Sequence, residues 1–385
     1  MFLYFPTNYV WSLSVNAALE SGGKMGEIDE VCKPLMDVAR QGDDAGTQAF
    51  FAAWVGLGDK LLGLAEEDEA LGRLFSAGEK LQRAAVYYVV AERMQAHSFA
   101  PRKALYRKAL DSFNRAQVLM RANCERIEIP YGDTHLAALY VRAEGVEGPA
   151  PLMVCLNGLD SIKELLYPLQ FTQQLARRGV SQLILDQPGT GEALRLHDMP
   201  AVYNTEVWAS KVVDYLETRT DVDPRRIGLM GVSLGGYYTP RAVAFEPRFA
   251  LGAVWGANHN WGEMQKRRLN REGENPVPHY WEHVRWVFGA DDMEQFMDKA
   301  RHMCLDGVLD GIRVPFLVTH GEQDRQIPVE YAHQTYDQLV NSPKRELKIF
   351  TDKEGGVHHV SLDNMANAGA FIADWIAENL GGRVA

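Results

Sequence analysis

The sequence lacks several features that identify whole classes of protein. Its 385 residues include four cysteines, which are widely separated and form no C-x-x-C pair. Four scattered cysteines are too few for a disulfide framework, so we expect reduced thiols and a cytoplasmic location. No segment approaches the roughly 20 uninterrupted apolar residues that a membrane-spanning helix needs. The apolar N-terminal segment has no basic region ahead of it and is interrupted by Pro6, so we expect neither a signal peptide nor an anchor.

The sequence also lacks an excess of positive charge. It contains 40 Lys and Arg residues and 51 Asp and Glu residues, and its formal net charge is -11. Because a negative field repels phosphate backbones and anionic lipids, we expect no nucleic-acid partner and no membrane partner. Hydrophobic residues make up 46% of the chain and charged residues 24%, which is typical of a globular protein with a packed core. The length suits a large catalytic domain with an additional module.

Strand signals are scarce near the N-terminus. Between residues 43 and 120 the sequence is rich in Ala, Leu, Glu, Lys and Arg, and apolar residues recur at intervals of three and four. This periodicity predicts helices over residues 48–64, 77–96 and 102–120. Residues 1–122 are therefore predicted to form a helical module, which we expect to cap the site and to form the surface of a homodimer.

The pattern changes near Cys124. Two predicted strands joined by a turn at residues 131–134 come first, and apolar runs then alternate with helical segments. Such runs are typical of a mostly parallel sheet flanked by helices, so residues 123–385 are predicted to form an α/β catalytic domain. The runs cover residues 151–156, 182–186, 226–230, 250–255, 314–319 and 346–350.

Residues 258–312 are too long for a single connection between neighbouring strands. They are predicted to form a helical lid insertion over the carboxyl edge of the sheet. The insertion is rich in aromatic residues, among them Trp261, Trp281 and Trp286. These side chains are predicted either to stack on a substrate or to form the core of the lid itself.

A nucleophile motif follows the third apolar run. Gly231-Val-Ser233-Leu-Gly235 has the G-x-S-x-G pattern and lies between an apolar strand and a helical segment. At such a turn the serine takes a strained backbone conformation, and the glycines allow the strand and the helix to approach closely. The motif predicts that Ser233 is the nucleophile of an α/β-hydrolase fold, whereas the alternative is a simple Gly-Ser turn.

A serine nucleophile needs a base that accepts its proton and an acid that orients the base. Asp324, in the loop after the run at residues 314–319, is the predicted acid, with Glu322 as the alternative. Asp324 is also in a position where it could cap the following helix. His358 and His359 follow the last run in a glycine-flanked loop, and either can be the base; His359 is preferred.

An oxyanion hole needs two backbone N–H donors. The loop Asn157-Gly158-Leu159-Asp160 follows the first apolar run, and the N–H groups of Leu159 and Leu234 are the predicted donors. Asp160 and Lys163 lie in or next to this loop. They are predicted either to orient the substrate or to brace the loop.

Two other motifs are weaker. Residues 279–283 read H-x-x-E-H, a zinc-peptidase signature, but no third ligand is evident, so we expect a lid helix with no metal and no cofactor. The segment Gly189-Thr-Gly191-Glu192 looks like a phosphate loop. It lacks the Lys-Ser/Thr pair that should follow, so a turn is predicted.

These motifs together resemble those of one group of α/β-hydrolases. The resemblance rests on residues 158–164, Asp186-Gln-Pro-Gly-Thr-Gly-Glu192, Gly231-Val-Ser-Leu-Gly-Gly236 and Glu246-Pro-Arg248, preceded by the helical module. The group contains the carbon–carbon bond hydrolase of dihydroxypseudooxynicotine and the fungal hydrolases that shorten naphthopyrone pigment precursors. The likeness covers almost the whole chain, and its opening residues look closest to the pigment branch.

The resemblance implies a retro-Claisen cleavage of a β-diketone-like aromatic or polyketide substrate. The serine, aspartate and histidine of the family fall on Ser233, Asp324 and His359. One departure is that His359 is followed by Val-Ser, where the resemblance leads us to expect Cys-Gln or Cys-Cys, and this keeps His358 open as the base. Serine attack and activation of water by the histidine both remain open. The alternative functions are a carboxylesterase or thioesterase with the same triad and, more distantly, a non-catalytic helical scaffold.

Overall fold

The computed structural model describes residues 1–384, which divide into two compact units. We call them the helical unit and the sheet unit, after their secondary structure. The boundary after residue 122 stays a prediction; the helical unit also includes two short stretches from later in the sequence. The helical unit consists of Met1–Cys124, Glu164–Leu169 and Asn275–Val284, and the sheet unit consists of Glu125–Lys163, Gln170–Glu274 and the residues from Arg285 onward.

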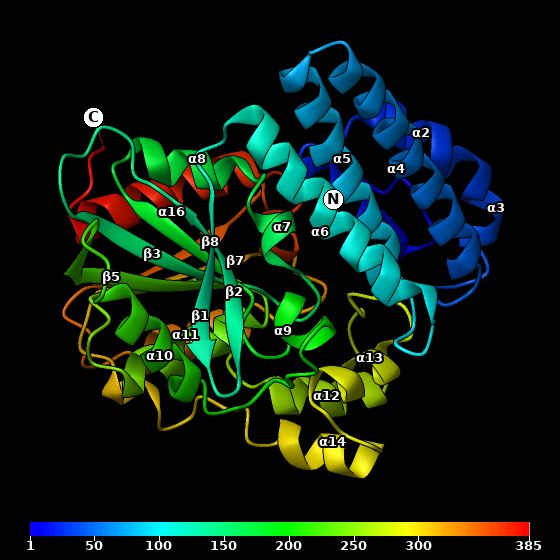
Figure 1. Cartoon of the computed structure of the whole chain (residues 1–385). Coiled ribbons are helices and arrows are strands. Elements are labelled where there is room, and N and C mark those ends of the chain that lie inside the picture. The colour runs from blue at the N-terminus through cyan, green and yellow to red at the C-terminus, as the bar shows by residue number, and fades with distance from the viewer. Residues whose placement is uncertain (385) are drawn as a thin grey trace. The chain divides into compact units, whose positions relative to one another are not determined.

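The helical unit is built around three long helices, α4 to α6, which follow one another along the chain (Figure 1). They correspond to the three predicted helices. α4 extends to Ala70 because residues 65–70 are mostly strong helix formers, and it ends before Gly72, whose φ of 73° suits a left-handed turn. The N-terminal elements are α1 (Tyr9–Glu20), α2 (Met25–Cys32), η1 (Lys33–Leu35), α3 (Met36–Ala39), α4 (Thr47–Ala70), α5 (Leu74–Arg93) and α6 (Pro101–Met120).

Aromatic side chains form much of the core of the helical unit. The ring of Trp54 stacks on Phe50, with 5.3 Å between the ring centroids, and meets Tyr87 edge-on at 5.6 Å. Trp11 contacts the other side of Phe50 at 4.9 Å. All four side chains are fully buried, so this cluster joins α1, α4 and α5.

The sheet unit contains one eight-stranded sheet in the order β1-β2-β4-β3-β5-β6-β7-β8. β1 and β2 are antiparallel to their neighbours, and every pairing from β4 to β8 is parallel. The predicted mostly parallel sheet is therefore confirmed. The strands are β1 (Glu125–Tyr131), β2 (Thr134–Val141), β3 (Ala150–Leu156), β4 (Ser181–Leu185), β5 (Val222–Val232), β6 (Leu251–Trp255), β7 (Phe316–Gly321) and β8 (Arg345–Phe350).

Helices cover both faces of this sheet. α8 (Gln170–Arg177) and α16 (Met365–Leu380) pack on one face, and α10 (Glu206–Leu216) and α11 (Gly235–Phe245) pack on the other (Figure 1). Every residue of β3, β4, β6 and β7 is buried, which explains why these strands read as continuous apolar runs. Because the parallel strands end at one common edge, the loops that follow β3, β5, β6, β7 and β8 gather there.

The connection between β3 and β4 contains two short helices. A turn separates α7 (Lys163–Leu166) from α8, although the sequence of residues 165–178 has a helical pattern throughout. Pro168 lies in this turn and cannot donate a backbone hydrogen bond. The helical pattern of the flanking residues did not reveal the interruption.

The predicted lid insertion, residues 258–312, is helical as expected. It contains α12 (Trp261–Leu269), α13 (Tyr280–Val287), α14 (Met293–Ala300) and the short η2 (Leu309–Gly311). Its role as a lid stays a prediction. The remaining elements are α9 (Gly191–Arg195), α15 (Glu330–Gln338) and η3 (His359–Ser361).

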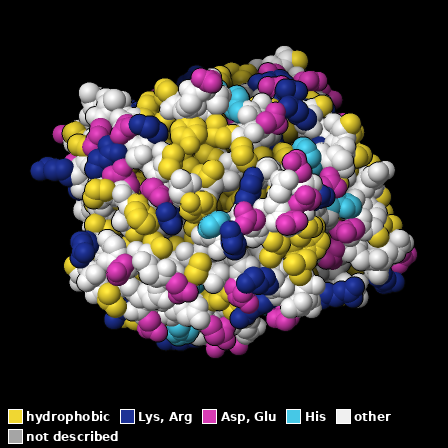
Figure 2. Space-filling view, turned by 90° about the horizontal axis from the view of Figure 1, so that it is seen from below, with side chains coloured by type: hydrophobic (Ala, Val, Ile, Leu, Met, Phe, Trp, Pro, Cys, Tyr) yellow, Lys and Arg dark blue, Asp and Glu magenta, His cyan; other side chains and the backbone are white. Residues whose placement is uncertain are grey.

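Charges of both signs are mixed on the surface. On the face shown in Figure 2, acidic and basic side chains lie close to one another, with hydrophobic patches between them. This face therefore presents no large field of one sign. Within residues 1–384, no helix combines the length and the apolar character that crossing a lipid bilayer requires.

We expect Trp54→Ala to lower the free energy of unfolding by about 3–5 kcal/mol, because it removes a large buried ring from the aromatic cluster. Urea denaturation followed by circular dichroism measures this change. Phe75→Ala is the control, since Phe75 is 62% exposed and its loss should change the free energy by less than about 0.5 kcal/mol. Equal effects of the two substitutions would contradict the packing described here.

Candidate active site

The turn between β5 and α11 holds Ser233 in a left-handed conformation. Its φ is 56°, which is unfavourable for a residue with a side chain. The turn depends on glycine at two positions. A Cβ on Gly231 would lie 2.4 Å from the carbonyl oxygen of Gly235, and a Cβ on Gly236 would lie 2.0 Å from that of Gly256. Larger residues would therefore push α11 away from the strands and displace Ser233.

Three side chains from distant loops meet at this turn. His359 Nε2 lies 2.8 Å from Ser233 Oγ, and His359 Nδ1 lies 2.8 Å from Asp324 Oδ2. The competing residues lie elsewhere: the His358 ring contacts the carbonyl oxygen of Gln323 at 3.3 Å, and Glu322 is exposed to solvent. The structure thus brings Ser233, His359 and Asp324 into one hydrogen-bonded chain and leaves the two alternatives outside it.

The carboxylate of Asp324 is fully buried but well provided with donors. Its Oδ1 accepts the backbone N–H groups of Gln326 and Ile327 at 2.8 and 3.0 Å. Burial alone would raise the pKa of Asp324, but the charge and the hydrogen bond of His359, together with His320, lower it. The acid is therefore ionised near neutral pH and can stabilise a positive charge on His359.

His320 is a neighbour of the acid that sequence reasoning did not find. Its ring is fully buried, with Nε2 3.5 Å from Asp324 Oδ2 and 3.0 Å from the carbonyl oxygen of Ile327. Its Nδ1 accepts the N–H of Ala257. Burial lowers the pKa of His320, so the ring is neutral and donates from Nε2 to Ile327. Its position four residues before Asp324, at the end of β7, was the available signal.

The histidine loop is strained and braced. Val360 and Ser361, which follow His359, both have a positive φ, at 44° and 58°. Ser361 Oγ accepts a hydrogen bond from the indole of Trp255 at 3.0 Å. The carboxylate of Asp363, also missed from the sequence, accepts three consecutive backbone N–H groups, from residues 356 to 358. These contacts fix the loop that carries the imidazole.

The loop after β3 lies directly against the serine. A Cβ on Gly158 would be 3.0 Å from Ser233 Cβ, so a larger residue would crowd the serine. Within residues 1–384, the backbone N–H groups of Leu159 and Leu234 have no hydrogen-bond acceptor. Two unpaired backbone donors flanking a serine are what an oxyanion hole requires.

The other predicted contact residues of this loop differ in exposure. Asp160 is half-buried. Lys163 is fully buried, and its Nζ lies 2.8 Å from Asp186 Oδ2 and 2.6 Å from Glu192 Oε1. An ammonium enclosed between two carboxylates favours bracing of the loop over contact with a substrate.

The predicted aromatic contacts lie in three different settings. Trp261 is 2% exposed and stacks on Phe288 at 4.8 Å, so it belongs to the core of the insertion rather than to a free stacking surface. Trp286 is half-buried, and the guanidinium of Arg195 lies 5.6 Å from its ring. Trp281 is a half-buried residue of the helical unit, next to Tyr280.

The H-x-x-E-H motif has local contacts in the helical unit. His279 Nε2 lies 3.3 Å from the hydroxyl of Thr47, and Glu282 accepts the backbone N–H of Ser98 at 2.7 Å. Across the described residues 1–384, no three His, Cys, Asp or Glu side chains are grouped so as to hold a metal ion.

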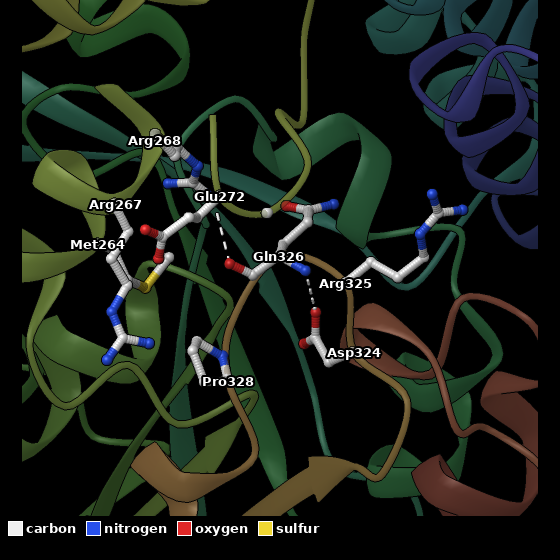
Figure 3. Close-up of a pocket in the computed structure, with 9 residues that line it drawn as sticks. Met264, Arg267, Arg268, Glu272, Asp324, Arg325, Gln326 and Pro328 are labelled. Atoms are coloured by element: carbon white, nitrogen blue, oxygen red, sulfur yellow. Dashed lines mark hydrogen bonds between the residues drawn. The ribbon is translucent and has the colours of Figure 1, made fainter. Parts of the chain in front are cut away.

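A cavity of about 260 Å³ borders the acid loop on the side of α12 (Figure 3). The Gln326 carbonyl accepts a hydrogen bond from Arg268 at 3.3 Å, and the Gln326 N–H donates to Asp324. Both contacts are visible in Figure 3. They connect α12 to the loop of the acid, so the position of Asp324 depends on the insertion as well as on the sheet.

The fold and this site define an α/β-hydrolase. A model of the FrsA-like esterase family matches residues 63–256, half of the chain, and a model of the prolyl oligopeptidase family matches residues 209–383. The chain therefore belongs to the FrsA-like esterase family and is a hydrolase. Membership of an enzyme family speaks against the scaffold alternative.

Named relatives and a solved structure support the same assignment. The chain is 31% identical to the 20-hydroxy-prefusarin hydrolase FUS2 of Gibberella moniliformis, over 72% of this chain and 74% of the relative. It is 29% identical to the 2,6-dihydropseudooxynicotine hydrolase of Paenarthrobacter nicotinovorans, over 86% and 84%. The crystal structure of the 2,6-dihydroxy-pseudo-oxynicotine hydrolase superimposes with a TM-score of 0.78 at 24% identity, over 96% of this chain and 97% of the other. The resemblance inferred from the motifs is thus confirmed, and so is the fold.

The lowered pKa of Asp324 predicts a specific dependence of stability on pH. An unfolded aspartate has a pKa of about 3.9, so the unfolded chain takes up a proton first as the pH falls. The carboxylate therefore contributes stability that is complete above about pH 5 and is lost as the pH falls through the unfolded and then the folded pKa. We expect the free energy of unfolding of Asp324→Asn to fall less steeply than that of the wild type between about pH 5 and pH 3. Urea denaturation of both proteins over this pH range measures the two free energies of unfolding. If they fall equally steeply with pH, the hydrogen bonds and charges described around Asp324 do not stabilise its ionised form.

Proposed function

We propose that the chain is a serine-nucleophile hydrolase that cleaves a carbon–carbon bond in a β-diketone-like aromatic or polyketide substrate by a retro-Claisen reaction. The observation that carries this proposal is the hydrogen-bonded chain from Ser233 Oγ through His359 to Asp324, with 2.8 Å at each link. In this chain a weak nucleophile lies within reach of a base whose other nitrogen is held by a buried acid.

The first step is addition of the serine to the side-chain ketone of the substrate. His359 Nε2 takes the proton of Ser233 Oγ as the oxygen bonds to the carbonyl carbon, and general-base catalysis of this kind contributes about 10²–10⁴-fold. Asp324 holds the tautomer with hydrogen on Nδ1 and stabilises the imidazolium. The N–H groups of Leu159 and Leu234 stabilise the oxyanion of the tetrahedral intermediate.

The intermediate then collapses with cleavage of the carbon–carbon bond. The electron pair leaves on the carbon between the two carbonyl groups and is delocalised into the second carbonyl or a phenol ring as an enolate. The imidazolium of His359 returns its proton to this leaving group. Water, deprotonated by His359, then hydrolyses the acyl ester on Ser233, so that one ketone and one water give a shortened product and a carboxylic acid.

The substrate class is supported by the relatives. They carry the names 20-hydroxy-prefusarin hydrolase and 2,6-dihydropseudooxynicotine hydrolase. Both relatives belong to the group that the sequence motifs of this chain resemble, and that resemblance implies cleavage of a carbon–carbon bond. The proposal includes a small-molecule substrate, no cofactor, a cytoplasmic location and a homodimer.

A second candidate function is hydrolysis of a carboxylic ester or thioester by the same residues. The match to the FrsA-like esterase family favours it. The two functions share the acyl-serine step and differ in the leaving group, which is an alkoxide or thiolate in one and a stabilised carbanion in the other.

We expect Ser233→Ala and His359→Ala to lower kcat by at least about 10³-fold while the dissociation constant of the substrate stays within a few-fold, because each removes a group that acts on the reacting atoms. His358→Ala is the matched control, since the His358 ring lies outside the hydrogen-bonded chain and contacts the backbone carbonyl of Gln323. Steady-state kinetics and calorimetric titration measure both quantities. A loss of activity in His358→Ala as large as that in His359→Ala would refute the assignment of the base.

The choice between the two functions is tested with two substrates. For carbon–carbon cleavage, an aromatic β-diketone such as an acetylacetyl-substituted naphthol should release acetate with a kcat/KM at least about 10²-fold above that for p-nitrophenyl acetate. Mass spectrometry identifies the shortened aromatic product. Efficient ester hydrolysis with no release of acid from the diketone would support the esterase instead.

A further inference from the structure

Both ends of the loop that contains Leu159 are hydrogen-bonded to the same oxygen atom, Asp186 Oδ1. Asp186 Oδ1 accepts a hydrogen bond from the Asn157 side-chain amide at 3.2 Å and from the backbone N–H of Lys163 at 2.9 Å. Asn157 begins the loop after β3, and Lys163 ends it. The five residues between these anchors contain Gly158, which touches Ser233, and Leu159, the proposed oxyanion donor.

The side chain of Gln187 makes two reciprocal hydrogen bonds with the backbone of Asn157, at the first end of the same loop. Its side-chain carbonyl accepts the Asn157 N–H at 3.1 Å, and its side-chain amide donates to the Asn157 carbonyl at 2.9 Å. The Asn157 side chain also donates to the backbone carbonyl of Leu185 at 2.8 Å. Gln187 and Asn157 are completely buried, so these hydrogen bonds do not compete with water.

Asp186 belongs to a network of ion pairs with Lys163, Glu192 and Arg126. Lys163 Nζ bridges Asp186 and Glu192, and Glu192 also pairs with Arg126 at 2.7 Å. Burial would raise the pKa of Glu192, but Lys163 and Arg126 lower it, so the carboxylate is ionised. Lys163 and Asp186 are inaccessible to solvent, and Arg126 reaches the surface. Arg126 also pairs with Glu128, and the removal of Lys163 alone would leave the buried carboxylates of Asp186 and Glu192 without the ammonium between them.

Glycine is required where the network meets α9. Gly191 has a φ of 45°, and a Cβ there would lie 1.8 Å from Asp186 Cγ. The Asp186 carboxylate also accepts the N–H of Glu192 at 3.0 Å. The segment from Asp186 to Glu192 was predicted from the sequence only as a turn. It contains the anchor Asp186, the glutamine that pairs with Asn157, a glycine that leaves room for the anchor, and the second acid.

We propose that Lys163, Asp186, Gln187 and Glu192 form a clamp that holds the oxyanion loop, residues 157–163, against Ser233. They are positioning residues, because they act on the transition state only through the loop. The proposal rests on the proposed function, in which the Leu159 N–H stabilises the oxyanion. Such a donor is effective only within about 0.5 Å of the productive geometry, and the loss of one donor costs about 10²–10³-fold in kcat.

The double variant Lys163→Met/Glu192→Gln tests the clamp. It removes the buried ammonium and one carboxylate together, so the net charge of the network does not change, and Asp186 keeps its hydrogen bonds from the Asn157 amide and from the backbone N–H groups of residues 163 and 192. The matched control is Lys211→Met, which makes the same change at an exposed ion pair on α10. We expect the double variant, but not the control, to show at least about ten-fold faster hydrogen exchange in peptides covering residues 157–163. Its kcat on whichever substrate the wild type hydrolyses should fall by about 10²-fold, with KM within about two-fold.

Wild-type exchange and wild-type kcat in a folded double variant would overturn the clamp. If the double variant does not fold, the wild-type protein and Gln187→Met are compared instead. The clamp predicts that the backbone amides of Asn157 and Lys163 exchange slowly in the wild type and faster in Gln187→Met. Rapid exchange of these amides in the wild type would overturn the clamp. Hydrogen exchange does not depend on the reaction. If the wild type hydrolyses neither substrate, the proposed function fails while the exchange result still tests the clamp.

Discussion

One imidazole, hydrogen-bonded on both sides, joins the three residues of the site. His359 makes contacts of 2.8 Å with Ser233 and with Asp324, and the three residues come from loops that follow β5, β7 and β8. A hydroxyl alone is a weak nucleophile, and a free imidazole in solution rarely meets one in a productive orientation. The remainder of the sheet unit therefore has to hold these three loops at fixed positions relative to one another, to within a fraction of an ångström.

Strain and buried charge both contribute to this precision. Ser233, Val360 and Ser361 all have a left-handed backbone, which the surrounding contacts must hold in place. Acidic acceptors stabilise the loops: the half-buried Asp363 binds three consecutive N–H groups of the histidine loop, and the fully buried Asp186 binds both ends of the loop beside the serine. Asp324 likewise accepts two backbone N–H groups of its own loop, so an acidic side chain that collects backbone donors recurs in three of the loops around the site. Each such carboxylate exchanges water for fixed donors of the protein.

Much of the fold could be predicted because its physical signals are local. Strands buried on both faces require continuous apolar runs, and the G-x-S-x-G turn requires glycines, so the sheet and Ser233 are visible in the sequence. The order of triad residues along the chain also pointed to the loop of Asp324 and to the pair His358 and His359. What the sequence could not show depends on contacts between distant residues. Nothing local distinguishes His359 from His358, identifies His320 as a neighbour of the acid, or shows that the ammonium of Lys163 faces two buried carboxylates. The same holds for Trp261, whose burial depends on Phe288, 27 positions further along.

The most direct test of the central claim is covalent labelling of the serine with a fluorophosphonate, which reacts with nucleophilic serines and needs no knowledge of the substrate. Peptide mass spectrometry should find one phosphonyl group on the tryptic peptide that contains Ser233, formed at least about 10²-fold more slowly in His359→Ala. A label on another residue, no label on the wild-type protein, or an unchanged rate in His359→Ala would contradict the account.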